Sequence, residues 1–361
     1  MTLSRRVRAL TLICLTTAAS ATAQPRTDRE LPLVYILATG GTIAGQAATS
    51  TNLTDYKPGL MGDQLVQAVP EIKQFARVRV EQIANIPSPD LTFTHWLTLA
   101  KRINAIYAED PSVAGVVITH GTNTIEETGY FLNLTVKHDR PVVMVGSMRP
   151  ATAISADGPL NLLNAVRTAI APESRGKGVL VVLNDEINGA RDVSKTNTYR
   201  VETFRGGELG LLGYVDADAV VFYRASLKRH TARSEFDVRG MTTLPPVDIV
   251  YSYVQPSTGM AQALVNGGVK GIVFAGTGAG LVSTAERDAV KPFQALPPDA
   301  QPVLVRSNRT GNGRVVALPE YDALGMVPAD NLNPQKARIL LMLALTRTRD
   351  RAEIRRMFAE Y

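Results

Sequence analysis

The chain has 361 residues, of which 45% are apolar and 20% charged, a balance typical of globular proteins, and this length favours two domains. Its formal charge of +6 includes no long basic run, so nucleic acid is not expected as a partner. With a single cysteine, Cys14, an internal disulfide is excluded.

The first 23 residues have the pattern of a secretory signal peptide. Three arginines among residues 5–8 precede an apolar segment at residues 9–19, and small residues at 21–23 supply a cleavage site before Gln24. This apolar segment is too short for a permanent membrane helix, and no later run approaches the required ~20 apolar residues, so no membrane anchor is expected. Residues 1–23 therefore predict export, to a periplasm or to the medium. Cleavage leaves a formal charge of +3 and no thiol, which excludes cysteine nucleophiles and thiolate metal sites.

Residues 30–224 alternate between β-branched apolar runs and segments of helical spacing. The runs predict strands at 33–38, 78–83, 113–119, 141–148 and 179–184, and the spacing predicts helices at 63–69, 95–107 behind Thr94, 125–137 and 159–171. This alternation predicts a larger N-terminal α/β domain with a parallel sheet and helices on both faces. The active site of such a sheet lies at the carboxyl ends of its strands, where Thr42, Thr122 and Ser147 fall.

We interpret residues 225–246 as an interdomain linker, because periodicity is lost there while charges, serines, threonines and prolines gather. Residues 247–361 are predicted to form a smaller C-terminal α/β domain. Its expected elements are strands at 247–254, 271–275 and 302–306, helices at 260–266, 284–296 and 335–345, the last capped by Asn333 and Pro334, and a final helix from Asp350.

The first polar loop follows the strand predicted at residues 33–38. Two glycines and then Thr42 end this apolar run, so a buried strand delivers a hydroxyl to a loop that can pack closely or adopt positive φ. Thr42 is therefore a candidate nucleophile. A phosphate-binding loop and a simple turn remain as alternatives, although the patterns G-x-G-x-x-G and Gly-Lys-Ser/Thr are both missing from this loop.

The second polar loop, residues 118–128, joins a predicted strand to a predicted helix. Thr124 and Glu127 have the spacing of a capping box, which places Thr122 and Asn123 just ahead of a helix N-terminus. Unpaired N–H groups at that position favour an oxyanion. The alternative is that these threonines only cap the helix and turn the chain.

A third polar loop, residues 189–198, contains Lys195. If burial lowers the pKa of this lysine, its amine can accept a proton and activate a threonine without histidine. The alternative is an ordinary solvated lysine. The four histidines have no metal-ligand spacing, so neither a metal nor another cofactor is expected, and His120, beside a candidate hydroxyl, is expected to pack under its loop.

Six motifs in one order resemble the exported bacterial (type II) L-asparaginases and glutaminase-asparaginases. They are TGGTIAG at 39–45, THGTNTIEET at 119–128, VVMVGSMRP at 142–150, SADGPLN at 155–161, RDVSKTNT at 191–198 and LNPQKARILL at 332–341. The resemblance implies the same two α/β domains and a small amino-acid amide as substrate. It also implies a homotetramer of intimate dimers, in which a neighbouring subunit completes each active site.

The resemblance further implies roles for individual residues. Thr42 is expected to attack the side-chain amide carbon of L-asparagine, which releases ammonia and leaves an acyl-enzyme that water hydrolyses to L-aspartate. Tyr56, on a flexible loop, is expected to help activate that hydroxyl, while Thr122 and Lys195 supply a proton network beside the amide. The expected substrate-binding residues are Gly41, Ser88, Gly121, Asn123, Ser147 and Glu320.

At the amino-acid end of the substrate, Ser88 is expected to hold the α-carboxylate, and Glu320 to reach the α-ammonium from the partner subunit. Three departures from the family pattern fall at this same end. Asn123 stands where aspartate is usual, Pro89 where glutamine or glutamate is usual, and residues 275–281 lack the common asparagines. Because an amide is a weaker partner than a carboxylate for an ammonium group, we expect altered affinity or specificity.

Other activities remain compatible with these motifs. The resemblance is compatible with an L-asparaginase of altered specificity, with a glutaminase-asparaginase that also takes L-glutamine, and with an enzyme for an amide that lacks a free ammonium group. An exported amide-binding protein with little turnover is an alternative from another class. The glutaminase component of an amidotransferase fits poorly with export.

Overall fold

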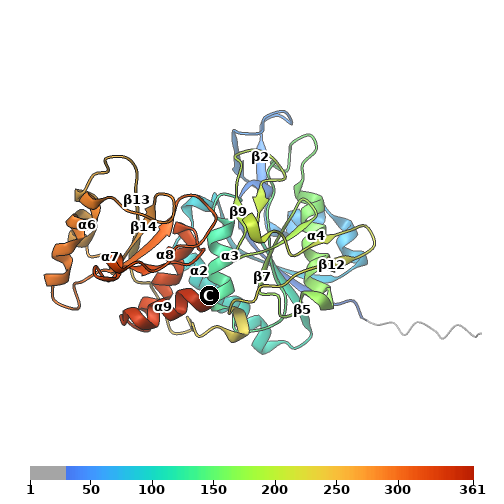
Figure 1. Ribbon diagram of the computed structural model, residues 1–361. Coiled ribbons are helices and arrows are strands. Elements are labelled where there is room, and N and C mark those ends of the chain that lie inside the picture. Colours follow the sequence, from blue (N-terminus) through green and yellow to red (C-terminus); the bar gives the residue numbers. More distant parts are fainter. Residues whose placement is uncertain (1–29) are drawn as a thin grey trace, which may run out of the picture. The chain divides into compact units, whose positions relative to one another are not determined.

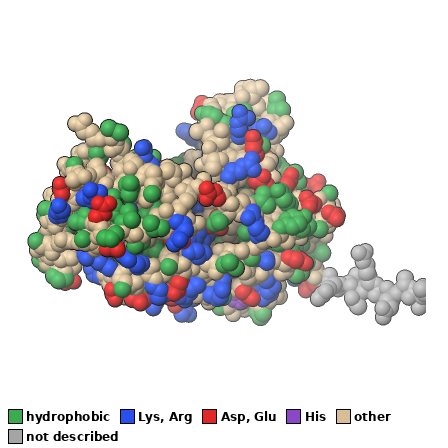
Figure 2. Space-filling view, viewed as in Figure 1, with side chains coloured by type: hydrophobic (Ala, Val, Ile, Leu, Met, Phe, Trp, Pro, Cys, Tyr) green, Lys and Arg blue, Asp and Glu red, His purple; other side chains and the backbone are tan. Residues whose placement is uncertain are grey.

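The computed structural model describes residues 30–361, of which residues 32–361 form one compact unit. The predicted signal peptide lies outside the described residues. An eight-stranded sheet occupies the N-terminal part of the unit, and a four-stranded sheet occupies the C-terminal part (Figure 1). Within residues 30–361, none of the helices combines the length and apolar character that a membrane span requires. Basic and acidic side chains are interspersed on the face that Figure 2 shows.

Five parallel strands form most of the large sheet, which has the order β12-β11-β8-β7-β6-β5-β1-β4. They are β4 (Arg77–Ile86), β1 (Leu33–Gly40), β5 (Val113–Thr119), β6 (Val142–Val145) and β7 (Val179–Leu183). β1, β6 and β7 are buried along their whole length, as expected for continuous apolar runs covered on both faces. The predicted parallel α/β arrangement is confirmed for this part of the sheet.

One edge of the sheet adds antiparallel strands that the apolar runs do not indicate. They are β8 (Glu186–Gly189), β11 (Gly213–Val215) and β12 (Val220–Phe222). The turn from β7 into β8 is made by Asn184 and Asp185, which have φ of 53° and 61°. Asparagine and aspartate tolerate this left-handed conformation, which a two-residue hairpin turn requires. The polar residues that end the predicted strand therefore reverse the chain.

Helices cover both faces of this sheet, as predicted. α1 (Gly62–Gln67) and α4 (Gly158–Ile170) pack in one core, and α2 (Phe93–Glu109) and α3 (Ile125–Thr135) pack in the other. Alternate residues of β1 point into the two cores, as the pleat of a strand requires. The helix predicted at 95–107 behind Thr94 begins two residues earlier, at Phe93, and its N-cap residue is Thr92, whose N–H donates to His95 Nδ1 at 3.1 Å.

The predicted capping box at the start of α3 is wrong. Thr124 is the N-cap residue, but its hydroxyl donates to the carbonyl oxygen of Ser88 at 2.9 Å and caps no helical N–H group. A partner distant in sequence therefore replaces the local one. α3 nevertheless begins at Ile125, so Thr122 and Asn123 lie just ahead of its N-terminus, as predicted.

The C-terminal part has a parallel sheet of β13 (Val247–Tyr251), β14 (Gly271–Gly276), β15 (Val303–Asn308) and β16 (Val327–Pro328). Its helices are α5 (Gly259–Asn266), α6 (Thr284–Val290), α7 (Pro319–Asp322), α8 (Pro334–Leu345) and α9 (Arg351–Glu360). The helix predicted at 284–296 ends at Val290, and a 3₁₀ turn that contains Pro292 follows it. The predicted cap Asn333 is confirmed, since it accepts from Lys336 N–H, and Asp350 accepts from Ala352 N–H at the start of α9.

Residues 225–246, the predicted linker, contain one short 3₁₀ turn at Thr231–Arg233. Phe236, Val238 and Leu244 from this segment are buried in the same hydrophobic cluster as the leucines of α8. The segment is therefore packed against the core along much of its length.

Candidate active site

Two glycines bring the first and second polar loops into direct contact. Gly41 has φ of 82°, and a Cβ atom added to it would lie 2.2 Å from the Cα atom of Gly121. Only glycine permits so close a backbone approach in this conformation. Since β1 and β5 are neighbouring parallel strands, the loops after them meet at one edge of the sheet. The loops that carry Thr42 and Thr122 therefore lie against each other.

Thr42 is paired with Tyr56. The Thr42 side chain is 8% exposed, and its Oγ1 lies 2.7 Å from Tyr56 Oη. Tyr56 belongs to a hairpin formed by β2 (Gly45–Ala47) and β3 (Tyr56–Pro58), which folds the chain back over the nucleophile loop. A Cβ atom on Gly45 would lie 2.7 Å from the Tyr56 ring, so this glycine makes room for the phenol.

Lys195 joins the second hydroxyl. It lies on β9 (Ser194–Lys195), which pairs antiparallel with β10 (Phe204–Arg205). Its Nζ donates to Thr122 Oγ1 at 2.9 Å and to Asn123 Oδ1 at 3.0 Å. Burial lowers the pKa of Lys195 below that of a free lysine. The predicted proton acceptor is therefore half-buried against Thr122 and is not an ordinary solvated lysine.

Ser88 lies beside the contact between the two glycines. It is 4% exposed, and a Cβ atom on Gly121 would approach its side chain to 2.8 Å. Within the described residues its hydroxyl has no hydrogen-bond partner. A buried hydroxyl without a partner is costly, and a bound polar group would satisfy it. The structure thus places Ser88 beside the loops that carry the two threonines.

Ser147 and His120 lie close to the site, and each makes one side-chain hydrogen bond to a nearby backbone carbonyl, while His120 Nε2 has no partner among the described residues. Ser147 is fully buried, and its Oγ donates to the carbonyl oxygen of Arg149 at 2.7 Å. His120 Nδ1 lies 2.7 Å from the carbonyl oxygen of Gly121, and burial lowers the pKa of His120 to about 4. The histidine is therefore neutral and packed under the loop, as predicted.

Glu320 is not brought to the other predicted residues within this chain. It lies on α7 with an exposed side chain, and its carboxylate is 3.5 Å from Arg287 Nη1. Among the described residues it makes no hydrogen bond or ion pair with Thr42, Thr122 or Lys195.

Two residues that sequence reasoning missed shape the loop around Ser147. The Asp157 carboxylate accepts from the N–H groups of Met148 and Arg149, both at 2.9 Å. Asn161 donates to the carbonyl oxygen of Gly146 at 3.1 Å. Both belong to the motif SADGPLN, and its polar residues are the signal by which they could have been found. Elsewhere in residues 30–361, His, Asp and Glu side chains form no group that could hold a metal ion.

Comparison with known protein families assigns both parts of the chain to asparaginase domains. The family model "Asparaginase, N-terminal" matches residues 33–228, and "Glutaminase/Asparaginase C-terminal domain" matches residues 246–358. A two-domain α/β fold with these matches and with paired hydroxyls beside a lysine defines the class as an amidohydrolase.

The similarity to individual proteins extends over nearly the whole chain. L-asparaginase 2 of Bacillus subtilis (strain 168) is 50% identical over 348 residues, which cover 95% of this chain and 90% of that protein. The Haemophilus influenzae protein named "Probable L-asparaginase periplasmic" is 47% identical over 92% of this chain and 94% of its own length. The structure of "Probable Cytoplasmic L-asparaginase" from Campylobacter jejuni is 46% identical, has a TM-score of 0.88, and matches 91% of this chain and 100% of that one. The chain belongs to the asparaginase family.

Proposed function

We propose that this protein hydrolyses the side-chain amide of L-asparagine to L-aspartate and ammonia through an acyl-enzyme on Thr42. One observation carries the proposal. The pair of Thr42 with Tyr56, at 2.7 Å, and the pair of Thr122 with Lys195, at 2.9 Å, lie on loops whose glycines touch. Each hydroxyl therefore has a neighbour that can take or return a proton where one small amide can bind.

In the first half of the proposed reaction, Thr42 Oγ1 bonds to the amide carbon while Tyr56 Oη takes the Thr42 proton and gives up its own proton toward the amide nitrogen. The oxyanion is stabilised by the N–H groups of the glycine-rich loops and of the α3 N-terminus. The C–N bond then breaks, and the amine takes a proton to leave as ammonia. In the second half, the pair of Thr122 and Lys195 accepts a proton from water as the water attacks the ester, and Thr42 regains its proton.

The proposed specificity differs from that of a site with aspartate at position 123. The Oδ1 atom of Asn123 already accepts from Lys195, so one of its two lone pairs remains for the substrate. This acceptor is uncharged, and it binds an α-ammonium more weakly than a carboxylate does. We therefore propose weaker selection for a free amino acid, with Pro89 adding no acceptor from its side chain. L-Glutamine is the second candidate substrate, supported by the glutaminase description of the matching C-terminal domain.

The assembly and the location are part of the proposal. We propose a homotetramer of intimate dimers, in which Glu320 reaches the site of a neighbouring subunit, because its own chain leaves it exposed on α7. We propose export to a periplasm or to the medium, because residues 1–23 have the pattern of a signal peptide. The relative from Haemophilus influenzae is named periplasmic, and the solved one from Campylobacter jejuni cytoplasmic.

The direct test is ammonia release from L-asparagine, D-asparagine, L-glutamine and succinamic acid, which lacks the α-amino group. We expect turnover of L-asparagine, and a smaller advantage over succinamic acid than an aspartate at position 123 would give. Intact-mass spectrometry of rapidly quenched reactions should reveal an acyl adduct in the wild type and none in Thr42→Ala. Binding without ammonia release on any of the four amides would instead identify an amide-binding protein and contradict the proposal.

A further inference from the structure

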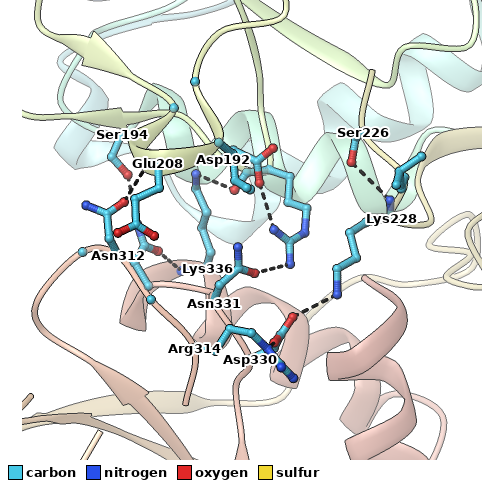
Figure 3. Close-up of a pocket in the computed structure, with 18 of the residues that line it drawn as sticks. Asp192, Ser194, Glu208, Ser226, Lys228, Asn312, Arg314, Asp330, Asn331 and Lys336 are labelled. Carbon is cyan, nitrogen blue, oxygen red and sulfur yellow. Dashed lines mark hydrogen bonds and ion pairs between the residues drawn. The ribbon is translucent and has the colours of Figure 1, made fainter. Parts of the chain in front are cut away.

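A cavity of about 540 Å³ lies beside the chain segment that leads into Lys195 (Figure 3). One part of its lining comes from Arg191, Asp192 and Ser194, and another comes from Asn331, Asn333 and Lys336 around the start of α8. Figure 3 shows the Lys336 side chain extending from α8 toward the loop that bears Asp192 and Ser194. The C-terminal part of the chain thus reaches the strand that carries the predicted proton acceptor.

Lys336 is a buried cation whose ammonium group donates hydrogen bonds to two backbone carbonyl oxygens. It is 1% exposed, and its Nζ donates to the carbonyl oxygen of Arg191 at 2.8 Å and to that of Val193. Glu126 and Glu127 on α3, with Arg191 and Asp192 on the loop, are the charged groups that act on it, and burial lowers its pKa to about 8. Since burying an ammonium is costly, these carbonyls must stay in place to receive its protons.

Asn333 holds the next residue of the same segment. Its Oδ1 accepts from the Lys336 N–H at 3.1 Å and so caps α8, while its Nδ2 donates to Ser194 Oγ at 3.0 Å. One side chain therefore connects the first turn of α8 to the residue before Lys195. Lys336 and Asn333, which we call the α8 clamp, together hold three of the four residues from Arg191 to Ser194.

We infer that the α8 clamp positions Lys195, so that Lys336 and Asn333 are positioning residues for the proposed amide hydrolysis. β9 has only two residues, and its single partner strand β10 is equally short. Such a ladder is too small to fix a side chain, whereas the clamp ties the preceding backbone to a 12-residue helix. This inference rests on the proposed function, because it concerns the placement of its proton acceptor.

The test compares Lys336→Met with Lys228→Met. Lys228 lines the same cavity but pairs with Asp330 and the carbonyl oxygen of Ala359, away from the segment before Lys195. We expect Lys336→Met to lower kcat about 10- to 100-fold with little change in KM, the penalty of a small misplacement of a catalytic group. The rising limb of its pH–rate profile should move to higher pH, because a displaced Lys195 is more hydrated. Lys228→Met should match the wild type, and equal kcat and pH profiles for the two variants would overturn the inference.

A second variant tests the clamp without removing a buried charge. Ser194→Ala deletes the hydroxyl that receives the Asn333 amide and leaves the cap of α8 intact. We expect kcat to fall about 2- to 10-fold, the range for one neutral hydrogen bond, with the same direction of shift in the pH profile. An unchanged kcat and profile here would count against the inference even if Lys336→Met does not fold.

A readout independent of turnover separates this inference from the proposed function. Acetylation of Lys195 by acetic anhydride, followed by peptide mass spectrometry across a pH series, reports the pKa of its amine in each full-length protein. In Lys336→Met the pKa should rise from the lowered value toward that of a free lysine. If the wild type releases no ammonia from any amide, the proposed function fails, yet a raised pKa in the variant still supports the clamp. An unchanged labelling curve would refute it.

Discussion

The two hydroxyl groups of the site are held by very different amounts of structure. The hydrogen-bond partner of Thr42 is Tyr56, which belongs to a hairpin of two three-residue strands. Most of the residues between these strands are exposed. The hydrogen-bond partner of Thr122 is Lys195, and the segment just before Lys195 is hydrogen-bonded to the buried Lys336 and to the helix cap Asn333. Segments with few buried contacts open at low free energy, whereas buried networks do not.

This difference suggests that one part of the site moves during the reaction and the other stays fixed. We expect the Tyr56 end of the hairpin to open for a substrate and to close again by remaking the hydrogen bond with Thr42, while residues 45–50 stay hydrogen-bonded to residues 151–154. The pair of Thr122 and Lys195 stays assembled and needs no substrate to form. Activity should therefore depend both on the hairpin that carries Tyr56 and on the pair of Thr122 and Lys195. Motion should be confined to the hairpin.

The largest effect is expected from Thr42→Ala. Removal of the proposed nucleophile should lower kcat by about 10⁴-fold or more, because no ester can form, while amide binding persists. Steady-state ammonia release and calorimetric titration with L-asparagine measure the two quantities. Thr49→Ala, on the exposed part of the hairpin, is the matched control and should retain wild-type turnover. Substantial hydrolysis by Thr42→Ala would remove the acyl-enzyme from the mechanism.

Lys195→Met tests the rigid side and should lower kcat about 10²- to 10⁴-fold, the contribution of a general base. The wild-type rate should rise with pH, because only the neutral amine accepts a proton. Since burial lowers the pKa of Lys195, that rise should fall below the pH at which a free lysine titrates. The variant should lose this limb of the pH–rate profile. A limb that persists in Lys195→Met would assign the titration to another group.

Tyr56→Phe tests the mobile side and should lower kcat about 10²-fold, since the ring can still pack against Gly45 while the proton carrier is gone. Hydrogen exchange should show the hairpin, residues 45–58, exchanging faster than residues 191–195, and slowing when L-aspartate binds. Tyr199→Phe, at a tyrosine that is 69% exposed, is the control. Equal protection of the two segments without ligand would contradict the division between them.

The contacts that continuous apolar strands impose could be predicted from sequence, whereas those made by short or distant segments could not. The meeting of Thr42 and Thr122 follows from continuous apolar runs, since adjacent parallel strands must end at one edge. The partnership of Tyr56 with Thr42 came only from family resemblance, because the strands of its hairpin are too short to leave a periodic pattern. The capping role that local spacing predicts for Thr124 is wrong because its hydroxyl donates to the carbonyl oxygen of Ser88, 36 residues away, and no local pattern encodes such a partner. The α8 clamp likewise joins segments more than 130 residues apart.

The smallest and most specific effect is expected from Asn123→Asp. A carboxylate at this position offers the α-ammonium a charged acceptor, so the preference for L-asparagine over succinamic acid should rise about tenfold, or ~1.4 kcal/mol. The same carboxylate would sit beside Lys195 Nζ, now 3.0 Å from Asn123 Oδ1, and should raise the pKa of that amine. The rising limb of the pH–rate profile should therefore move to higher pH while selectivity improves. Ratios of kcat/KM for the two amides, measured across pH, test both effects, and a gain in selectivity without the pH shift would show that position 123 contacts the substrate but not the proton acceptor.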